Sequence, residues 1–361
     1  MISTLIENIP YGVLAGTITL LLALSLSPIA RAIGLLDQPG GRKQHKGNIP
    51  LIGGICIFIT FAATFFLAAE TIPEIRWLVI STSLLLGIGI IDDFFDMRAL
   101  YKLVAQAVAV GLMMWQTGLY VNHIAYLPDG TSLQLGNFGY AVTLLAVVGM
   151  INAFNMSDGI DGLTGAHALI CIFALTLIIN FLDRQLIHQP YLDIFRGAIG
   201  GYLLVNLAMS SKRKVFLGDA GSMMIGFICA WIVIYYTQLP PQKALPPSMA
   251  LWLFAILIFD TLTVSLRRGL QGRSPMSADR THLHHIYLRM GFNSHQALGI
   301  ITLKSIFLII LGFCSYIFAG DIWTLILFIV GALVYFLVMK RIWVITRFIR
   351  ASRHNKSDGK N

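Results

Sequence analysis

Long stretches with almost no charged residues limit what this chain can fold into more than any other feature. Apolar runs recur from residue 10 to residue 345 of the 361-residue sequence, and only 12% of all residues are Asp, Glu, Lys or Arg. An ordinary soluble domain has about 25% charged residues. A run of about 20 apolar residues is long enough to cross a bilayer as a helix. The sequence therefore predicts an integral membrane protein.

The apolar runs predict an all-α fold, a polytopic bundle of about eleven transmembrane helices. They cover residues 10–32, 51–69, 77–91, 101–120, 139–155, 163–182, 194–210, 220–237, 249–266, 297–318 and 321–345. Residues 1–345 are expected to form one integral-membrane catalytic domain, and residues 346–361 a basic cytoplasmic tail. The first run lacks a small-residue cleavage site after a short core, so we expect it to anchor the chain rather than to act as a signal peptide.

Lys and Arg are distributed unequally between the two sides of the bundle, and this asymmetry predicts its orientation. The loops that follow odd-numbered spans contain most of these residues. Because basic loops stay in the cytoplasm, the N-terminus is expected outside, in the periplasm, and the C-terminus in the cytoplasm. Topology and contact with anionic lipid headgroups account for the net charge of +9. The charge therefore gives no reason to expect nucleic-acid binding.

Carboxylates gather at span ends on the predicted cytoplasmic side. Asp92, Asp93 and Asp96 follow the third span within five residues. If this stretch is helical, Asp92 and Asp96 share one face, with Asp93 beside them. Such a group repels itself unless a cation is bound, and Mg²⁺ prefers oxygen ligands. A solvated helix end is the alternative, which the apolar neighbours disfavour because charge is costly at headgroup depth.

A second acidic segment ends the fifth span. Residues 152–162 read NAFNMSDGIDG, and no Lys or Arg in this segment neutralises Asp158 or Asp161. A bound cation or hydrogen-bond donors are therefore expected here, beside Asn155. Two glycines next to the carboxylates permit tight turns and close approach of a ligand. A plain turn is the alternative.

Two further segments could bind an anion at the start of a helix. Asp219 stands in the sequence VFLGDAGS at the start of the eighth span. Free backbone amides at a helix start favour phosphate, so this segment is predicted to hold a cation or a phosphate. In the first cytoplasmic loop, Lys46 precedes a Pro and two glycines that open the second span. A turn whose lysine only contributes to the membrane orientation would explain the Lys46 segment equally well.

The longest cytoplasmic loop, residues 267–296, contains three histidines within four residues. The charged residues and histidines of this cluster are, in order, Asp279, Arg280, His282, His284 and His285. Phosphate binding or proton transfer is favoured over zinc, because no cysteine or second histidine cluster completes a tetrahedral site. Asp260, inside the ninth span, is a further candidate, although an ion pair with Arg267 or Arg268 would also explain it.

These polar segments are all predicted to meet at the cytoplasmic surface of the membrane. Asp clusters, a glycine-rich helix start, basic residues and a histidine loop together are typical of metal-assisted phosphoryl transfer. A site at headgroup depth has one face toward the cytosol and one toward lipid. The sequence therefore favours an enzyme that joins a cytosolic nucleotide compound to a lipid phosphate.

The motifs resemble those of the polyprenyl-phosphate N-acetylhexosamine-1-phosphate transferases across essentially the whole chain. The matching segments are DDFFD at residues 92–96, NAFNMSDGIDG at 152–162, VFLGDAGS at 215–222 and DRTHLHH at 279–285. The resemblance is strongest to the branch that makes undecaprenyl-diphospho-GlcNAc and UMP from UDP-GlcNAc and undecaprenyl phosphate. It implies a multi-pass enzyme of the bacterial inner membrane that starts O-antigen or enterobacterial common antigen glycans. It also implies Mg²⁺, or Mn²⁺ in its place, and leaves a homodimer open.

The resemblance also implies roles for individual residues. Asp219 would be the principal metal ligand, while Asp92 and Asp93 would organise the metal and the lipid phosphate. Asp158 and His284 would complete the catalytic set. The remaining residues would bind substrate, with Asn155, Asp161, Phe216 and Lys46 on the nucleotide side, Arg268, Arg280, His282 and His285 at the sugar diphosphate, and Asp96 nearby.

Several alternatives stay open at this point. Leu283 interrupts a histidine run that is fuller in the relatives that transfer MurNAc-pentapeptide phosphate, which favours the smaller sugar. Another UDP-HexNAc or the MurNAc-pentapeptide is the alternative donor. An intramembrane prenyltransferase is a more remote alternative. Such an enzyme should have a second Asp-rich motif like that at residues 92–96, and Asp158 and Asp161 form only part of one. A secondary transporter would place its carboxylates at the bilayer midplane and often shows repeat symmetry.

Overall fold

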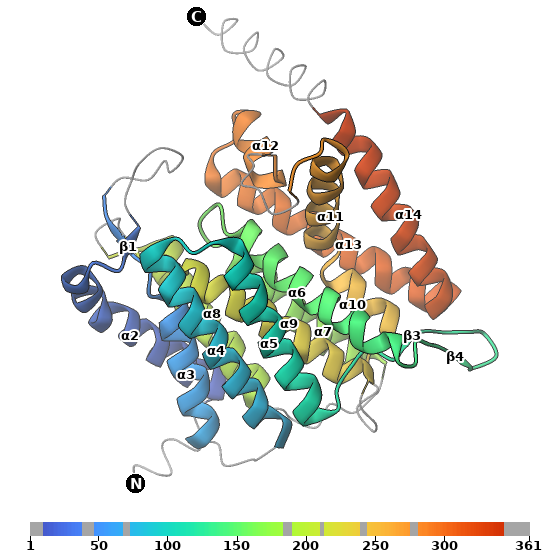
Figure 1. Cartoon of the computed structure of the whole chain (residues 1–361), viewed down its shortest axis with the longest axis horizontal. Coiled ribbons are helices and arrows are strands. Elements are labelled where there is room, and N and C mark those ends of the chain that lie inside the picture. Colours follow the sequence, from blue (N-terminus) through green and yellow to red (C-terminus); the bar gives the residue numbers. More distant parts are fainter. Residues whose placement is uncertain are drawn as a thin grey trace, which may run out of the picture.

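The protein is a bundle of helices with very little sheet (Figure 1). The computed structural model describes residues 10–37, 47–67, 73–182, 190–209, 213–238, 244–274 and 281–342. Lys46, Arg280 and the predicted tail at residues 346–361 lie outside these ranges. The prediction of an all-α bundle is confirmed.

Every predicted span coincides with a helix. The helices are α2 (Tyr11–Ile33), α3 (Gly53–Leu67), α4 (Pro73–Phe95), α5 (Ala99–Thr117), α6 (Phe138–Ser157), α7 (Leu163–Phe181), α8 (Pro190–Leu203) with the π-helix η1 (Leu204–Ala208), α9 (Gly218–Gln238), α10 (Pro247–Leu253), α11 (Ala255–Leu270), α12 (Leu283–Arg289), α13 (Ser294–Ala319) and α14 (Asp321–Lys340). Two short pairs of strands accompany them, β1 (Leu36–Asp37) with β2 (Ile49–Pro50) and β3 (His123–Tyr126) with β4 (Ser132–Gln134).

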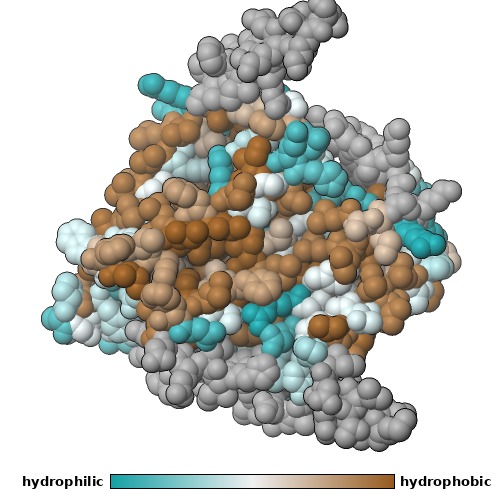
Figure 2. Space-filling model, turned by 180° about the vertical axis from the view of Figure 1, so that it is seen from behind, coloured by the Kyte–Doolittle hydropathy of each residue, from teal (hydrophilic) through white to brown (hydrophobic). Residues whose placement is uncertain are grey.

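Several of the helices have the length and apolar character of transmembrane spans. Within the described ranges, seven meet this description, namely α2, α4, α6, α7, α9, α13 and α14. α10 and α11 meet at 74° and would form an eighth, broken span. Figure 2 shows a broad hydrophobic band across one face of the molecule, with hydrophilic patches toward its upper and lower margins. The chain is therefore a multi-pass membrane protein, while the count of eleven spans and their orientation stay predictions.

α9 is the central helix of the bundle (Figure 1). All its residues except Asp219 are buried, as expected for a helix that is apolar all round. α3 and α4 approach its first turn through glycines. A Cβ on Gly89 would lie 2.2 Å from Ala220 Cα, and a Cβ on Gly54 would lie 2.2 Å from Gly221 Cα. These close approaches place two neighbouring helices against the turn that contains Asp219.

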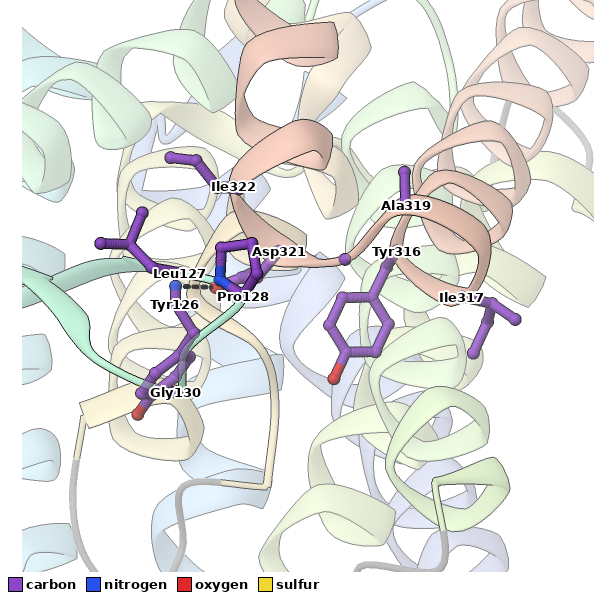
Figure 3. A pocket seen from close by; sticks show the side chains of 10 residues that line it. Tyr126, Leu127, Pro128, Gly130, Tyr316, Ile317, Ala319, Asp321 and Ile322 are labelled. Atoms are coloured by element: carbon purple, nitrogen blue, oxygen red, sulfur yellow. Dashed lines mark hydrogen bonds between the residues drawn. The ribbon is translucent and has the colours of Figure 1, made fainter.

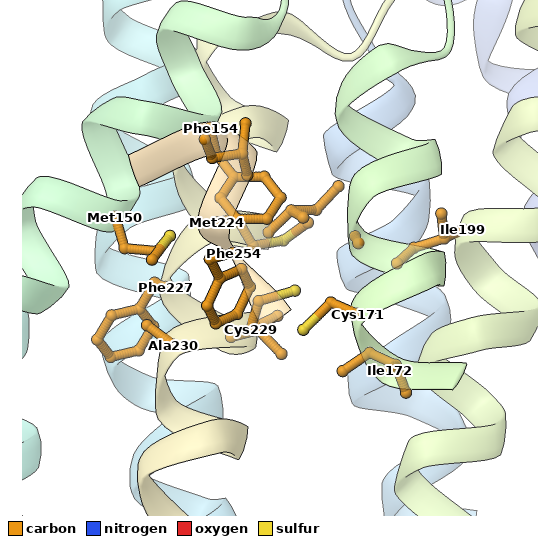
Figure 4. Close-up of a cluster of buried hydrophobic side chains, with 14 of the residues drawn as sticks. Met150, Phe154, Cys171, Ile172, Ile199, Met224, Phe227, Cys229, Ala230 and Phe254 are labelled. Atoms are coloured by element: carbon orange, nitrogen blue, oxygen red, sulfur yellow. The ribbon is translucent and has the colours of Figure 1, made fainter. Parts of the chain in front are cut away.

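The core beside α9 contains large apolar side chains from α6, α7 and α8 and the Phe254 ring between α10 and α11 (Figure 4). The rings of Phe154 and Phe254 meet edge to face, with their centres 6.0 Å apart. Cys171 and Cys229 are buried in the same cluster as free thiols. Such packing fixes the C-terminal half of α6 relative to α9. It thereby positions the polar residues that follow α6 and begin α9.

α2 and α8 pack through two glycine motifs with the spacing G-x-x-x-G. A Cβ on Gly197 would lie 2.0 Å from the carbonyl oxygen of Gly12, and a Cβ on Gly201 would lie 2.2 Å from that of Gly16. Small residues at this spacing let helix backbones approach closely in a membrane. This contact joins the first helix of the chain to a helix near its middle.

Replacing Gly201 with Ala should destabilise the protein, because the new methyl group meets backbone rather than a movable side chain. We expect a loss of about 1–3 kcal/mol in the free energy of unfolding. Gly200→Ala is the matched control, since no described atom lies within 4 Å of a Cβ at Gly200. Thermal unfolding of both variants in detergent measures the difference. Equal midpoints would show that the close contact with Gly16 is not needed.

At the opposite end of the bundle from the acidic segments, β3 and β4 form a hairpin whose turn contains Pro128 and Gly130. Asp321, at the start of α14, accepts hydrogen bonds from the backbone N–H of Tyr126 at 2.7 Å and of Ser248 at 3.2 Å. A cleft of about 720 Å³ opens between the hairpin and the α13–α14 turn (Figure 3). No predicted site residue lines this cleft.

Candidate active site

The first group of site residues joins the end of α4, the start of α5 and the start of α9. Lys102 Nζ donates to Asp92 Oδ2 at 2.7 Å and to Asp219 Oδ2 at 3.3 Å. The other oxygen of Asp92 accepts from the backbone N–H of Met97 at 2.7 Å. The side chain of Asp92 is 3% exposed, whereas that of Asp219 is 40% exposed. One ammonium group therefore joins a buried and an open carboxylate from two helices.

Asp93 has a different role from its neighbour. Its Oδ1 accepts from the backbone N–H of Asp219 at 2.8 Å, and its Oδ2 from that of Ala220 at 3.3 Å. Amides at a helix start favour an anion. The prediction that these amides are free for a phosphate is wrong, because the Asp93 carboxylate occupies them. Asp92 therefore shares Lys102 with Asp219, whereas its neighbour Asp93 joins α4 to α9.

Two residues with positive φ shape this region. Gly218 has φ +75°, and a Cβ there would lie 2.5 Å from Asp93 Oδ2, so this position requires glycine. Asp96 has φ +48° and is exposed just after α4 ends at Phe95. The predicted alignment of Asp92 and Asp96 on one helix face therefore does not form, because the chain leaves the helix before Asp96.

Partly buried amide side chains lie next to this group, further into the bundle. Asn155 Nδ2, in the last turn of α6, donates to Ser222 Oγ of α9 at 2.9 Å. About one turn further into the bundle, Asn152 Nδ2 donates to Gln106 Oε1 of α5 at 2.7 Å. These two contacts fix α5, α6 and α9 relative to one another. The predicted contact of Asn155 with the nucleotide stays a prediction.

The turn between α6 and α7 contains Asp158 and Asp161. Lys214 forms a salt bridge with Asp161, and its Nζ lies 5.6 Å from the centre of the Phe216 ring. The hydrogen-bond donor expected beside Asp161 is the Lys214 ammonium, because the basic segment before α9 reaches this turn. Burial raises the pKa of Asp158 to about 7. Asp158 is thus a carboxyl group whose charge a nearby cation or donor would stabilise.

The histidine loop is docked on α11. His282 Nδ1 lies 2.8 Å from Asp260 Oδ2, and the backbone N–H of Leu283 donates to Asp260 Oδ1 at 3.1 Å. His284 is buried, and its ring centre lies 4.2 Å from that of His285. Burial lowers the pKa of His284 to about 3, so the imidazole is neutral at physiological pH. His284 therefore provides a neutral nitrogen rather than a positive charge.

The histidine loop meets the acidic turn at Gly159. A Cβ on Gly159 would lie 2.0 Å from His284 Nε2. Among the residues that the structure describes, this nitrogen is buried without a hydrogen-bond partner. Arg268 is buried in the last turn of α11, the helix that also contains Asp260. The sequence segments around residues 158–161 and 282–285, predicted to act together, are therefore in direct contact.

Gly159→Ala should displace the His284 imidazole and lower activity. We expect turnover to fall at least tenfold, since a shift of about 1 Å at a site can cost about 100-fold. Gly149→Ala in α6 is the control, because no described atom lies within 4 Å of a Cβ there. Initial rates of the two variants at saturating substrate give the comparison. Equal rates of the two variants would show that the position of the His284 ring does not affect the reaction.

The carboxylates can be tested for their fit to a metal ion. In the described part of the chain, no three Asp, Glu, His or Cys side chains form a group able to hold a metal ion, so the zinc alternative gains no support. Mg²⁺ has a smaller requirement, since one or two carboxylates bind it together with substrate phosphates and water. Asp92 and Asp219 fit this requirement. Their role as Mg²⁺ ligands stays a prediction.

Lys102 is the main site residue that none of the predicted motifs includes. Its signal was present, because Lys102 lies within the predicted span at residues 101–120, and a charge inside an apolar run indicates function. Lys214 gave no comparable signal, since three consecutive basic residues before α9 also satisfy the orientation rule.

The amino-acid sequence has known relatives. The sequence profile of glycosyl transferase family 4 matches residues 75–237, which include the Asp92, Asn155 and Asp219 segments. Proteins with 35–38% identity also match about nine-tenths of the chain. The chain therefore belongs to glycosyl transferase family 4, and the resemblance seen in its motifs is confirmed.

The full-length relatives share one name, undecaprenyl-phosphate alpha-N-acetylglucosaminyl 1-phosphate transferase. The protein of Escherichia coli O157:H7 is 38% identical over 341 residues, which cover 92% of each chain. That of Yersinia pestis is 37% identical over 337 residues, again 92% of each chain. That of Haemophilus influenzae is 35% identical over 329 residues, which cover 90% of this chain and 92% of the relative.

Proposed function

We propose that this chain transfers GlcNAc 1-phosphate from UDP-GlcNAc to undecaprenyl phosphate, which yields undecaprenyl-diphospho-GlcNAc and UMP. Its full-length similarity to transferases of that name supports the proposal. The structural observation that supports it most is the Lys102 ammonium shared by Asp92 and Asp219 at the ends of membrane helices. Such a group suits the binding of phosphates and a divalent cation. Because Lys and Arg gather at the same helix ends, we place the site on the cytoplasmic side of the bacterial inner membrane.

In the proposed reaction, the lipid phosphate attacks directly. A phosphate monoester has a second pKa near 6, so it is mostly dianionic at neutral pH and needs little general-base help. One of its oxygens attacks the phosphorus that bears the sugar, the bond from that phosphorus to the UMP oxygen breaks, and UMP leaves. Lys102 binds and orients the negatively charged phosphates, and Asp92 holds Lys102 in place. When bound at Asp219 and Asp92, Mg²⁺ supplies neutralisation of the diphosphate charge.

The test is transfer of labelled sugar phosphate from UDP-GlcNAc to undecaprenyl phosphate by the purified protein, with release of UMP. We expect labelled lipid that disappears with EDTA and returns with Mg²⁺. UDP-MurNAc-pentapeptide serves as the parallel donor and should give no product. Product from UDP-MurNAc-pentapeptide alone would agree with the family but show that the donor is not UDP-GlcNAc. No product from either donor would contradict the proposal.

A covalent mechanism is the alternative to direct attack. An Asp side chain would then take the phospho-sugar from UDP-GlcNAc before the lipid arrives. Labelled UMP would exchange into UDP-GlcNAc in the absence of lipid acceptor. We expect no such exchange, because the lipid phosphate is already a competent nucleophile.

A further inference from the structure

Asp260 has a set of contacts that the proposed reaction does not use. Its side chain lies in α11, within the bundle, and is 14% exposed. Oδ2 lies 2.8 Å from His282 Nδ1, while Oδ1 accepts from the backbone N–H of Leu283 at 3.1 Å and from the Tyr335 hydroxyl of α14 at 3.3 Å. Both oxygens of one carboxylate therefore join α11 and α14 to the histidine loop.

The contact with Asp260 determines which ring nitrogen of His282 has the proton. An ionised carboxylate oxygen can only accept a hydrogen bond, so His282 donates through Nδ1. In the neutral ring the single proton then resides on Nδ1, and Nε2 is the nitrogen left for a ligand. Carboxylates that orient a histidine in this manner fix its tautomer and the direction of its ring.

The effect of Asp260 extends beyond one ring. The rings of His282 and His284 are parallel within 5°, with their centres 6.2 Å apart. His284 in turn packs on Gly159, between the two carboxylates of the acidic turn. Arg267, also on α11, donates to Thr281 just before the first histidine. A shift of His282 would therefore move a loop that contacts the acidic turn.

We propose that Asp260 is a positioning residue, which holds His282 with Nε2 directed to the sugar diphosphate of the donor. This inference rests on the proposed function, because it assigns the histidine loop to donor binding. Asp260 acts through His282 and does not touch substrate. Loss of its acceptor should therefore weaken donor binding selectively, and it should leave the lipid acceptor unaffected.

The first test is Asp260→Asn, which keeps the size of the side chain and removes its purely accepting character. We expect the dissociation constant of UDP-GlcNAc, measured without acceptor, to rise about 10- to 100-fold. The KM for undecaprenyl phosphate should stay within about twofold of the wild-type value. Asp321→Asn is the matched control, since Asp321 is also a hydrogen-bonded acid in the bundle but lies at the opposite end. It should lower thermal stability and leave both substrate constants unchanged.

A double-mutant cycle with His282→Gln separates positioning from a structural role. If Asp260 acts through His282, Asp260→Asn should add little to the loss caused by His282→Gln. Additive losses, equal losses for both substrates, or a wild-type donor affinity in Asp260→Asn would each overturn the inference. Asp260→Glu, which keeps a carboxylate, should recover donor affinity. If Asp260→Asn does not fold, a folded His282→Gln with wild-type donor affinity would overturn the inference. Wild-type protein that lacks transfer activity would instead contradict the proposed function.

Discussion

Asp219→Asn is expected to lower the turnover number about 100- to 1000-fold. The substitution removes the most open carboxylate of the Lys102 group and with it the proposed principal Mg²⁺ ligand. Loss of about 3–4 kcal/mol of charge stabilisation in the transition state corresponds to this factor. The Asp219 side chain is 40% exposed, so the folded structure should survive the change. Initial rates of labelled transfer across a range of Mg²⁺ concentrations provide the measurement.

Asp129→Asn is the control for this variant. Asp129 is exposed in the hairpin at the opposite end, where its side chain accepts hydrogen bonds from Thr131. Its substitution should leave both turnover and Mg²⁺ dependence unchanged. If Asp219→Asn turns over at a near-normal rate at ordinary Mg²⁺ concentrations, Asp219 is not the metal ligand and Asp92 becomes the main candidate.

Lys102→Met is expected to reduce both activity and stability. The variant leaves Asp92, which is 3% exposed, without its ammonium partner. Breaking a buried ion pair costs about 3–5 kcal/mol, and the cost here should be about 2 kcal/mol because Lys102 itself is 21% exposed. Turnover should fall at least about 100-fold, because the charge that orients the phosphates is lost. Thermal unfolding in EDTA and transfer assays measure the two effects.

Added Mg²⁺ gives this variant a distinctive behaviour. A divalent cation between Asp92 and Asp219 would replace the missing ammonium, so Mg²⁺ should raise the unfolding midpoint of Lys102→Met more than that of the wild type. Lys304→Met is the control, because it also removes a lysine charge from a helix. Lys304 belongs to α13, and its Nζ lies 5.2 Å from the centre of the Tyr287 ring. A Lys102→Met protein with wild-type midpoint and turnover would show that the Asp–Lys group has no role.

The helices of this protein could be predicted from sequence because a bilayer requires long apolar runs. The bend within the ninth predicted span was not predictable in this manner. α10 and α11 meet at 74° around Phe254, and neither Pro nor Gly stands at that position to indicate a break. α12 was also missed, since its seven residues are too short for a periodic pattern. Hydropathy thus identifies the spans but does not report how each span is shaped.

The residues of the candidate site were predictable as types, whereas their partners were not. Asp92, Asp93 and Asp219 stand out because charge is costly at a membrane boundary. Their division into a Lys102 pair and a helix-capping carboxylate depends on how α4, α5 and α9 pack. The salt bridge of Lys214 with Asp161 joins segments more than fifty residues apart. Such pairings follow from tertiary packing, which no local pattern in one sequence reports.

The contact between α2 and α8 has a consequence for biosynthesis. Gly16 is made about 180 residues before Gly197, so at about 5–20 residues per second α2 waits roughly 10 to 40 s for its partner. During that interval the glycine-lined face of α2 lacks its α8 partner, while the segments that form α3 to α7 are synthesised. The close glycine contacts of the first helix are therefore completed only after more than half of the chain has been made.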